Sequence, residues 1–182
     1  MMARAAHAIL LAWGWRRALI ALVAGALSAL AFAPFNIWPV MFVTLPIAVL
    51  LIDGAAAGRW GGLAAAALSG WWFGFGFFLA GLYWVGYAFL VDADQFGWLL
   101  PIAVTLLPAG LALFMALGFA LARVIWTKDA GRILALAAAL TLSEYLRGHI
   151  LTGFPWNALG YSLAGTPALA QNAAFVGLWG LT

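Results

Sequence analysis

The residue types that can do chemistry in this chain gather between positions 143 and 162, which read S-E-Y-L-R-G-H-I-L-T-G-F-P-W-N-A-L-G-Y-S. Glu144 and Arg147 stand three positions apart at the end of a long apolar stretch, so on a helix they share one face and can form an ion pair. The Arg147 guanidinium also suits phosphate, because its planar fork donates two parallel hydrogen bonds. Two interpretations remain open: a structural ion pair, or a functional pair that orients a loop or touches a lipid headgroup.

A helix-breaking turn follows this pair. Gly153 lets the backbone turn, and Pro155 ends helical structure. Trp156 and Tyr161 carry amphipathic rings that favour the headgroup level of a membrane, and the polar Asn157 lies between them. The sequence therefore predicts an aromatic belt at a re-entrant turn, which we call the elbow (residues 150–166).

Several other chemistries are excluded or not expected. The chain has no cysteine, which rules out disulfides, thiolate metal sites and a cysteine nucleophile within it. His7 and His149 are isolated, with no second ligand at metal-binding spacing, so we expect no metal and no cofactor. Residues 160–164 read G-Y-S-L-A, which lacks the last glycine of a G-x-S-x-G nucleophile motif, so a serine hydrolase is not expected.

The composition identifies the solvent around these residues as lipid. Hydrophobic residues make up 68% of the 182 positions and charged residues only 7%, and the mean hydropathy is +1.10. A soluble domain of this composition would expose large apolar patches and aggregate. Alanine and leucine dominate, and no ten-residue alternating strands occur, so helices are favoured over a membrane barrel. We predict an all-α fold, a polytopic transmembrane helix bundle.

A helix needs about twenty apolar residues to cross the hydrocarbon core of a bilayer. By this measure residues 1–182 form one transmembrane domain with five complete spans and the start of a sixth. Gly70 and Gly74 in the third span form a G-x-x-x-G pair, which favours close packing of helices. The predicted spans are residues 18–35, 38–55, 61–90, 96–126, 131–151 and 167–182, after a short interfacial segment at 5–15.

The charges in the gaps between spans predict the orientation. Basic residues favour the cytoplasmic side of a membrane, and seven of the eight fall at the N-terminus or in the second and fourth gaps. Only Arg147 lies on the other side, and the third gap holds Asp92 and Asp94 without a base. We therefore expect a cytoplasmic N-terminus, a periplasmic 143–166 region, and basic residues that set topology rather than bind nucleic acid. The alternative for the start is a cleaved signal peptide that ends near Ala31.

Three separated stretches resemble one known family. They are A-F-A-P-F-N-I-W-P at 31–39, G-W-W-F-G-F-G-F-F-L-A-G-L-Y-W-V at 70–85, and the 143–162 stretch quoted above. In this order they resemble the membrane half of bacterial apolipoprotein N-acyltransferases. The resemblance extends over most of the 182 residues, but it corresponds to only about the first third of a complete enzyme of the family.

The resemblance implies a function. Members of the family transfer an acyl chain from a membrane phospholipid to the amino group of the N-terminal diacylglyceryl-cysteine of an apolipoprotein, in the bacterial inner membrane. A cysteine nucleophile, a glutamate base and a lysine that stabilises the oxyanion act in a nitrilase-like periplasmic domain that follows the helices. None of these three maps onto this chain, so we expect no catalytic residue here and a fragment that is inactive alone. The resemblance implies a lipid or substrate entrance near Glu144, Arg147, Trp156, Asn157 and Tyr161.

Two hypotheses from other classes stand beside this one. The chain could be a non-catalytic membrane module that binds lipid or pairs with a separate nitrilase-like subunit. It could also be a small transporter, which requires a polar site near the middle of the bilayer. The sequence offers only Ser69, Thr105 and Thr141 there, and such hydroxyls commonly bond to nearby carbonyl groups of their own helix.

Overall fold

The computed structural model describes residues 2–55 and 62–182, and all regular structure in these ranges is helical. The predicted all-α class is confirmed. Arg59 and the first residue of the predicted span 61–90 lie outside the described residues. The α-helices are α1 (Met2–Leu10), α2 (Gly14–Ser28), α3 (Met41–Asp53), α4 (Leu63–Gly81), α5 (Ala93–Phe96), α6 (Leu100–Val124), α7 (Gly131–His149), α8 (Pro167–Ala170) and α9 (Ala173–Gly180). Short 3-10 helices are η1 (Ala29–Ala31), η2 (Trp38–Val40), η3 (Tyr83–Leu90), η4 (Gly97–Leu99) and η5 (Leu159–Leu163).

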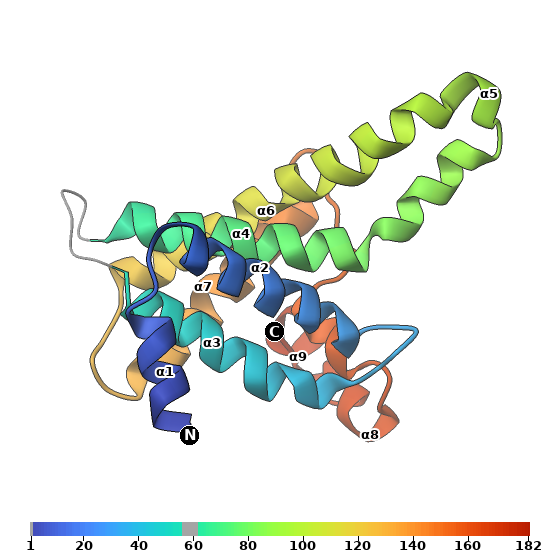
Figure 1. Ribbon diagram of the computed structural model, residues 1–182. Helices are drawn as coiled ribbons and strands as arrows, with labels where there is room; N and C mark the ends of the chain where they lie inside the picture. The colour runs from blue at the N-terminus through green and yellow to red at the C-terminus, as the bar shows by residue number, and fades with distance from the viewer. Residues whose placement is uncertain (1, 56–61) are drawn as a thin grey trace.

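The helices α2, α3, α4, α6 and α7 run back and forth between two ends of the molecule (Figure 1). α4 lies centrally and packs against α2 and α6, and α6 in turn packs against α7. At one end, which we call the α1 end, Gly54 lies against Leu10 and Trp126 bonds to Asp53. The opposite end, which we call the elbow end, brings together the turn between α2 and α3 and the elbow.

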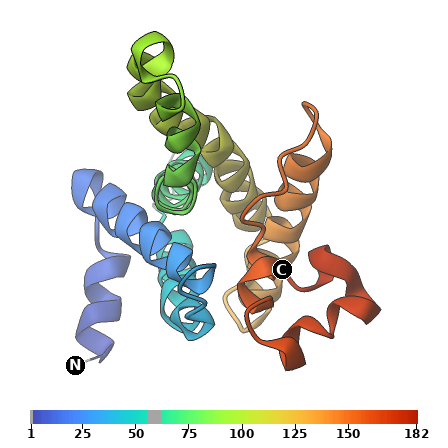
Figure 2. The same ribbon diagram turned by 90° about the vertical axis from the view of Figure 1, so that its right-hand side faces the viewer.

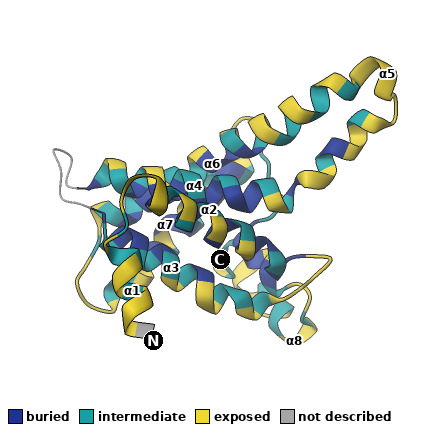
Figure 3. Cartoon of the chain, in the orientation of Figure 1, coloured by how far each residue is buried: buried dark blue, intermediate teal, exposed yellow. Residues whose placement is uncertain are grey.

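An arm extends from the elbow end of the bundle. It consists of η3, α5, η4 and the first turns of α6, and it projects beyond the other helices in both views (Figures 1 and 2). Most of its residues are exposed, whereas buried residues gather where the long helices meet (Figure 3). The arm therefore contributes surface at the elbow end rather than core.

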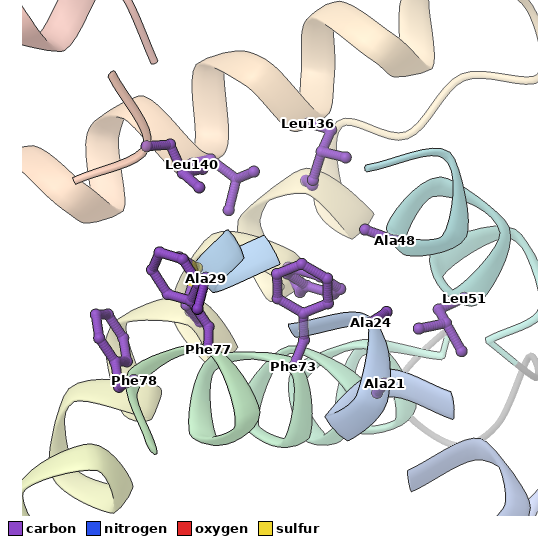
Figure 4. Close-up of a cluster of buried hydrophobic side chains, with 14 of the residues drawn as sticks. Ala21, Ala24, Ala29, Ala48, Leu51, Phe73, Phe77, Phe78, Leu136 and Leu140 are labelled. Atoms are coloured by element: carbon purple, nitrogen blue, oxygen red, sulfur yellow. The ribbon is translucent and has the colours of Figure 1, made fainter. Parts of the chain in front are cut away.

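The core between α2 and α4 pairs large side chains with small ones. Phe73, Phe77 and Phe78 on α4 are at most 1% exposed, and they share one cluster with Ala21 and Ala24 of α2 (Figure 4). Small residues on one helix let the other helix approach, which is how helices associate in lipid. The small residues of α2 therefore leave room for the phenylalanine rings of α4, and the two helices can pack closely.

Glycines on α4 allow an equally close approach of α6. A Cβ atom added to Gly70 would lie 2.6 Å from the main-chain oxygen of Met115, and one added to Gly74 would lie 2.6 Å from the Met115 Cβ atom. Both distances are too short for any larger residue. The G-x-x-x-G pair therefore acts in helix packing, as its spacing predicts.

Within residues 2–55 and 62–182, three segments are long and apolar enough to cross a membrane: Gly14–Ala31, Leu63–Gly81 and Ala93–Val124. The apolar stretch that includes α3, Trp38–Asp53, is shorter. α7 has 19 residues but carries Arg132, Glu144 and Arg147. The segment predicted to begin a sixth span differs most, because it forms two short helices, α8 and α9, instead of one continuous helix. The backbone of Gly177 inside α9 has a positive φ of 67°, which interrupts helical geometry.

Candidate functional site

A pocket of about 480 Å³ opens at the elbow end of the bundle. Three segments that are far apart in the sequence line it, and all of their lining residues except Ala164 fall within the stretches 31–39, 70–85 and 143–162. We call it the elbow pocket. Its lining residues are Phe32, Ala33 and Asn36 from the turn between α2 and α3, Gly81 and Trp84 where α4 meets the arm, and Pro155, Trp156, Asn157, Tyr161 and Ala164 from the elbow.

Two asparagines shape the turns that meet at this pocket. Asn36 has a φ of 55° and Asn157 a φ of 53°, in the left-handed region that asparagine tolerates better than most residues. The Asn157 amide lies directly against Gly81, where a Cβ atom would collide with it. In the same way, a Cβ atom at Gly165 would lie 2.6 Å from the Asn36 side-chain oxygen. Each turn is thus fixed by contact between an asparagine and a glycine of another segment.

The pocket has an aromatic and uncharged lining. Trp156 and Tyr161 are 53% and 44% exposed, and Trp84 is also partly exposed, so these rings lie at the surface. The Asn157 side-chain nitrogen is buried and has no hydrogen-bond partner among the described residues. A buried donor of this kind favours an acceptor oxygen beside it.

Glu144 and Arg147 lie beneath the elbow, and each is only 1% exposed. The Arg147 guanidinium donates to the main-chain oxygens of Phe154 and of Trp156, the latter at 2.8 Å. It also stands 5.0 Å above the ring of Phe78, a cation–π contact that helps to accommodate the buried charge. The Arg147 side chain therefore fixes the first half of the elbow by donating hydrogen bonds to main-chain carbonyl groups of that half.

The Glu144 carboxylate holds the second half of the elbow. Its two oxygens each lie 3.0 Å from the main-chain nitrogen of Leu159, and the hydroxyl of Thr182 donates to it at 2.9 Å. The closest distance between Glu144 and the Arg147 guanidinium is 3.6 Å. The predicted ion pair is therefore present, and it is buried under the elbow instead of lying at the surface. We call these two residues the elbow clamp.

The sequence comparison supplies the family. Residues 24–182 match the family described as the apolipoprotein N-acyltransferase N-terminal domain. The chain belongs to the apolipoprotein N-acyltransferase family. It is 65% identical over its whole length to the apolipoprotein N-acyltransferase of Rhodopseudomonas palustris, covering 34% of that protein. It is 63% identical to that of Bradyrhizobium diazoefficiens over 97% of this chain and 33% of the relative, and 52% identical to that of Brucella suis over 100% and 35%. The chain therefore spans about a third of the length of the curated relatives it matches.

The sequence of this N-acyltransferase-family member does not indicate several residues of the candidate site. Leu159 and Thr182 are partners of Glu144, but one contributes only a backbone N–H and the other a single hydroxyl, which carry no recognisable pattern. Asn36 and Trp84 lie within the two upstream stretches, 31–39 and 70–85, so only their membership of these stretches pointed to them. Gly81 had no signal of its own, because its importance comes from its contact with Asn157.

The α1 end of this family member carries its own polar cluster. Arg132 donates to Asp53 at 2.7 Å, and the Trp126 indole donates to the same carboxylate at 2.8 Å. In the neighbouring α6–α7 connection, hydrogen bonds from the Thr127 hydroxyl and then the Gly131 N–H hold the pKa of Asp129 below its usual value. No group of three histidine, aspartate or glutamate side chains that could hold a metal comes together in residues 2–55 and 62–182.

Proposed function

We propose that this chain is the membrane-embedded N-terminal part of an apolipoprotein N-acyltransferase, and that the elbow pocket belongs to the route by which lipid reaches the enzyme. In this proposal the complete enzyme transfers an acyl chain from a membrane phospholipid to the N-terminal amine of a diacylglyceryl-modified apolipoprotein. One observation carries the proposal: three stretches that resemble the family converge on a single pocket with aromatic residues at its surface.

The five residues of the proposed entrance divide into two roles. Trp156 and Tyr161 present partly exposed rings, which suit the boundary between headgroups and acyl chains. Asn157 lines the pocket beside these rings, and its amide packs against Gly81, so we assign it to shaping the wall of the entrance. Glu144 and Arg147 contact the elbow main chain and are nearly inaccessible, so we assign them to positioning the elbow and not to contact with a headgroup.

The proposed location is the bacterial inner membrane, with the N-terminus in the cytoplasm and the elbow at the periplasmic surface. The arrangement of charge supports this orientation. Lys128 and Arg132 lie at the α1 end, together with the N-terminal arginines of the α1–α2 region, whereas Asp92 and Asp94 lie on the arm at the elbow end. In this orientation α2, α3, α4, α6 and α7 are the proposed spans.

We expect no acyl transfer by this chain alone. Transfer through a thioester requires a cysteine thiolate, and the sequence contains no cysteine. The chemistry would then depend on the remainder of the enzyme, which the longer relatives possess. In an assay with a phospholipid donor and a diacylated lipopeptide, the purified chain should show no turnover, and sustained turnover would contradict this expectation.

A chimaera tests the entrance. In this chimaera, residues 1–182 of the present chain replace the matching N-terminal third of the Rhodopseudomonas palustris relative, to which they are 65% identical. We expect Trp156→Ala with Tyr161→Ala to raise the KM for phospholipid roughly tenfold with a smaller change in kcat, because contacts with non-reacting parts of a substrate contribute uniform binding. Trp98→Ala is the matched control, since Trp98 is an exposed tryptophan of the arm that does not line the pocket. Equal effects of both changes on KM would contradict a role in lipid access.

The alternative, a non-catalytic module that pairs with a separate nitrilase-like subunit, shares the pocket and the missing cysteine. Co-expression with the C-terminal two thirds of the same relative as a separate polypeptide addresses it. Activity of the two pieces together would show that this chain can work as a subunit. Activity of the chimaera alone would favour the continuous enzyme.

A further inference from the structure

A second and larger hollow lies along a different face of the molecule, between α3 and α7. It is a groove of about 710 Å³, and nearly all of its lining is aliphatic or aromatic. We call it the α3–α7 groove. Its lining includes Met41, Phe42, Leu45, Pro46, Val49 and Leu50 on α3, and Arg132, Ile133, Leu136, Ala137 and Leu140 on α7. The spacing of three and four residues along both helices shows that one face of each forms a continuous apolar wall.

The two ends of this groove differ in charge. Among the described residues that line it, Arg132 alone is charged, and it lies on the first turn of α7 at the α1 end. Ser162 and Thr182 line the groove near the elbow, and both are neutral. The groove is therefore amphipathic along its length, with a cation at one end and a long apolar channel leading away from it.

Arg132 keeps part of its hydrogen-bonding capacity. One of its terminal nitrogens donates to Asp53 at 2.7 Å, and its side chain is 37% exposed. A guanidinium has five N–H donors, so a single carboxylate contact leaves several for a further anion. Trp126, which bonds to Asp53, marks this level as an interfacial one, because indole rings favour the membrane boundary.

The side chains of the walls favour a flexible tail over a packed helix. Helices that associate in lipid use small residues at the contact, as α2, α4 and α6 do here. Among the described lining residues on α3 and α7, Ala137 alone is of that kind, and the others are bulky, with Phe42 74% exposed. A methylene chain can follow such an irregular wall, whereas a helix would meet protruding side chains.

We propose that the α3–α7 groove binds one acyl chain of a membrane phospholipid, whose phosphate is held by Arg132. The lipid comes from the leaflet at the α1 end, so this site is separate from the elbow pocket and does not depend on the proposed acyl transfer. The Asp53–Arg132 pair orients the guanidinium toward the headgroup, and the apolar walls hold the tail. The tail is already in an apolar solvent, so the walls hold it through van der Waals packing, as helices hold one another in lipid.

Photolabelling of the whole 182-residue chain in micelles of a non-ionic detergent, which supplies no competing phosphate, tests this site. The probe is a phosphatidylethanolamine with a diazirine in one acyl chain, and the comparison probe is a diacylglycerol with the same chain but no phosphate. We expect phosphatidylethanolamine adducts on peptides of α3 and α7. Labelling by the diacylglycerol should be roughly tenfold weaker, because a charge-assisted hydrogen bond to Arg132 is absent.

Three variants separate the tail site from the headgroup site. Ala137→Phe places a ring in the groove and should reduce labelling more than about tenfold, because the ring occupies the space of the acyl chain. Ala138→Phe is the matched control, because Ala138 is the next residue of α7, is exposed and does not line the groove. Arg132→Lys retains a cation for Asp53 but loses the planar fork, so it should reduce phosphatidylethanolamine labelling and leave diacylglycerol labelling unchanged.

Two outcomes would overturn the proposal. Equal labelling of Ala137→Phe and Ala138→Phe would place the lipid elsewhere. Loss of groove labelling when the C-terminal two thirds of the Rhodopseudomonas palustris relative is co-reconstituted would mean that protein, not lipid, fills the groove. If Ala137→Phe fails to fold, competition on the unaltered chain decides. Excess unlabelled phosphatidylethanolamine should suppress labelling, and a failure to do so would count against the site.

Discussion

Both carboxylate oxygens of Glu144 lie 3.0 Å from the main-chain nitrogen of Leu159, although fifteen positions separate these residues in the sequence. This contact joins the end of α7 to the second half of the elbow, while Arg147, one turn further on, holds the first half. A buried ion pair contributes little net stability, because desolvation offsets much of the attraction between the charges. The elbow clamp is therefore better understood as a device that fixes one loop conformation.

Loss of the Glu144 carboxylate should strongly destabilise the fold. We expect Glu144→Ala to lower the free energy of unfolding by about 3–5 kcal/mol, because it leaves the Arg147 charge buried without its partner. Glu144→Gln should cost less, since its amide oxygen still accepts from Leu159. Chemical unfolding in mixed micelles, followed by circular dichroism, measures both. Leu142→Ala on the exposed face of α7 is the control, and an equal loss there would contradict the assignment.

Arg147 should control the mobility of the elbow. Arg147→Lys keeps the positive charge but offers one ammonium group in place of a fork that reaches two carbonyl groups. We expect the reactivity of a cysteine placed at Tyr161 to rise several-fold in this variant. The unaltered chain has no cysteine, so the measured reactivity comes from the introduced thiol alone. A cysteine at Lys128, at the other end of the bundle, should react at the same rate in both backgrounds.

Close packing of α4 on α6 should depend on Gly74. Gly74→Ala places a Cβ atom 2.6 Å from the Met115 Cβ atom and 3.0 Å from the Ala112 Cα atom, so one helix must shift. Overpacking of this kind costs about 1–3 kcal/mol. Gly110→Ala on α6 is the matched control, because its added methyl group meets no atom within 4 Å. Thermal unfolding of both variants in detergent should separate them, and similar midpoints would argue against tight contact.

Arg17 should stabilise the junction of three helices at the α1 end. Its guanidinium donates to the Ser69 hydroxyl of α4 at 2.7 Å and to the main-chain oxygen of Leu51 near the end of α3. We expect Arg17→Met to cost about 1.5–3 kcal/mol, the usual contribution of hydrogen bonds to a charged group. Arg16→Met is the control, because Arg16 is exposed on the same turn of α2. An equal cost for both changes, measured by unfolding in micelles, would contradict this role.

The orientation of the bundle can be tested with the same cysteine-free background. We expect a membrane-impermeant maleimide added outside spheroplasts to modify Tyr161→Cys and to leave Lys128→Cys unmodified until the membrane is permeabilised. This follows from the concentration of basic residues at the α1 end. Modification of both cysteines, or of Lys128→Cys alone, would reverse the assignment of the two faces.

The segment expected to begin a sixth span folds differently from what its composition predicts. Residues 167–182 are apolar enough to predict the start of a long helix, yet the chain turns repeatedly there. Gly177 adopts a conformation that interrupts the helix, and glycine permits this without indicating that it will occur. Thr182 then bonds to Glu144, a contact whose value depends on the position of a helix more than thirty residues earlier.

Local composition and spacing by themselves determined the lipid environment, the helical class, the G-x-x-x-G contact and the pairing of Glu144 with Arg147, because each follows from residues within a few turns of one another. Only the tertiary structure decided that Asn36, Gly81 and Asn157 meet in one pocket, and that the ion pair is buried under the elbow instead of facing lipid. The physical reason is that these features arise from close contact between distant segments. Backbone groups and glycines make such contacts without leaving a pattern in the sequence.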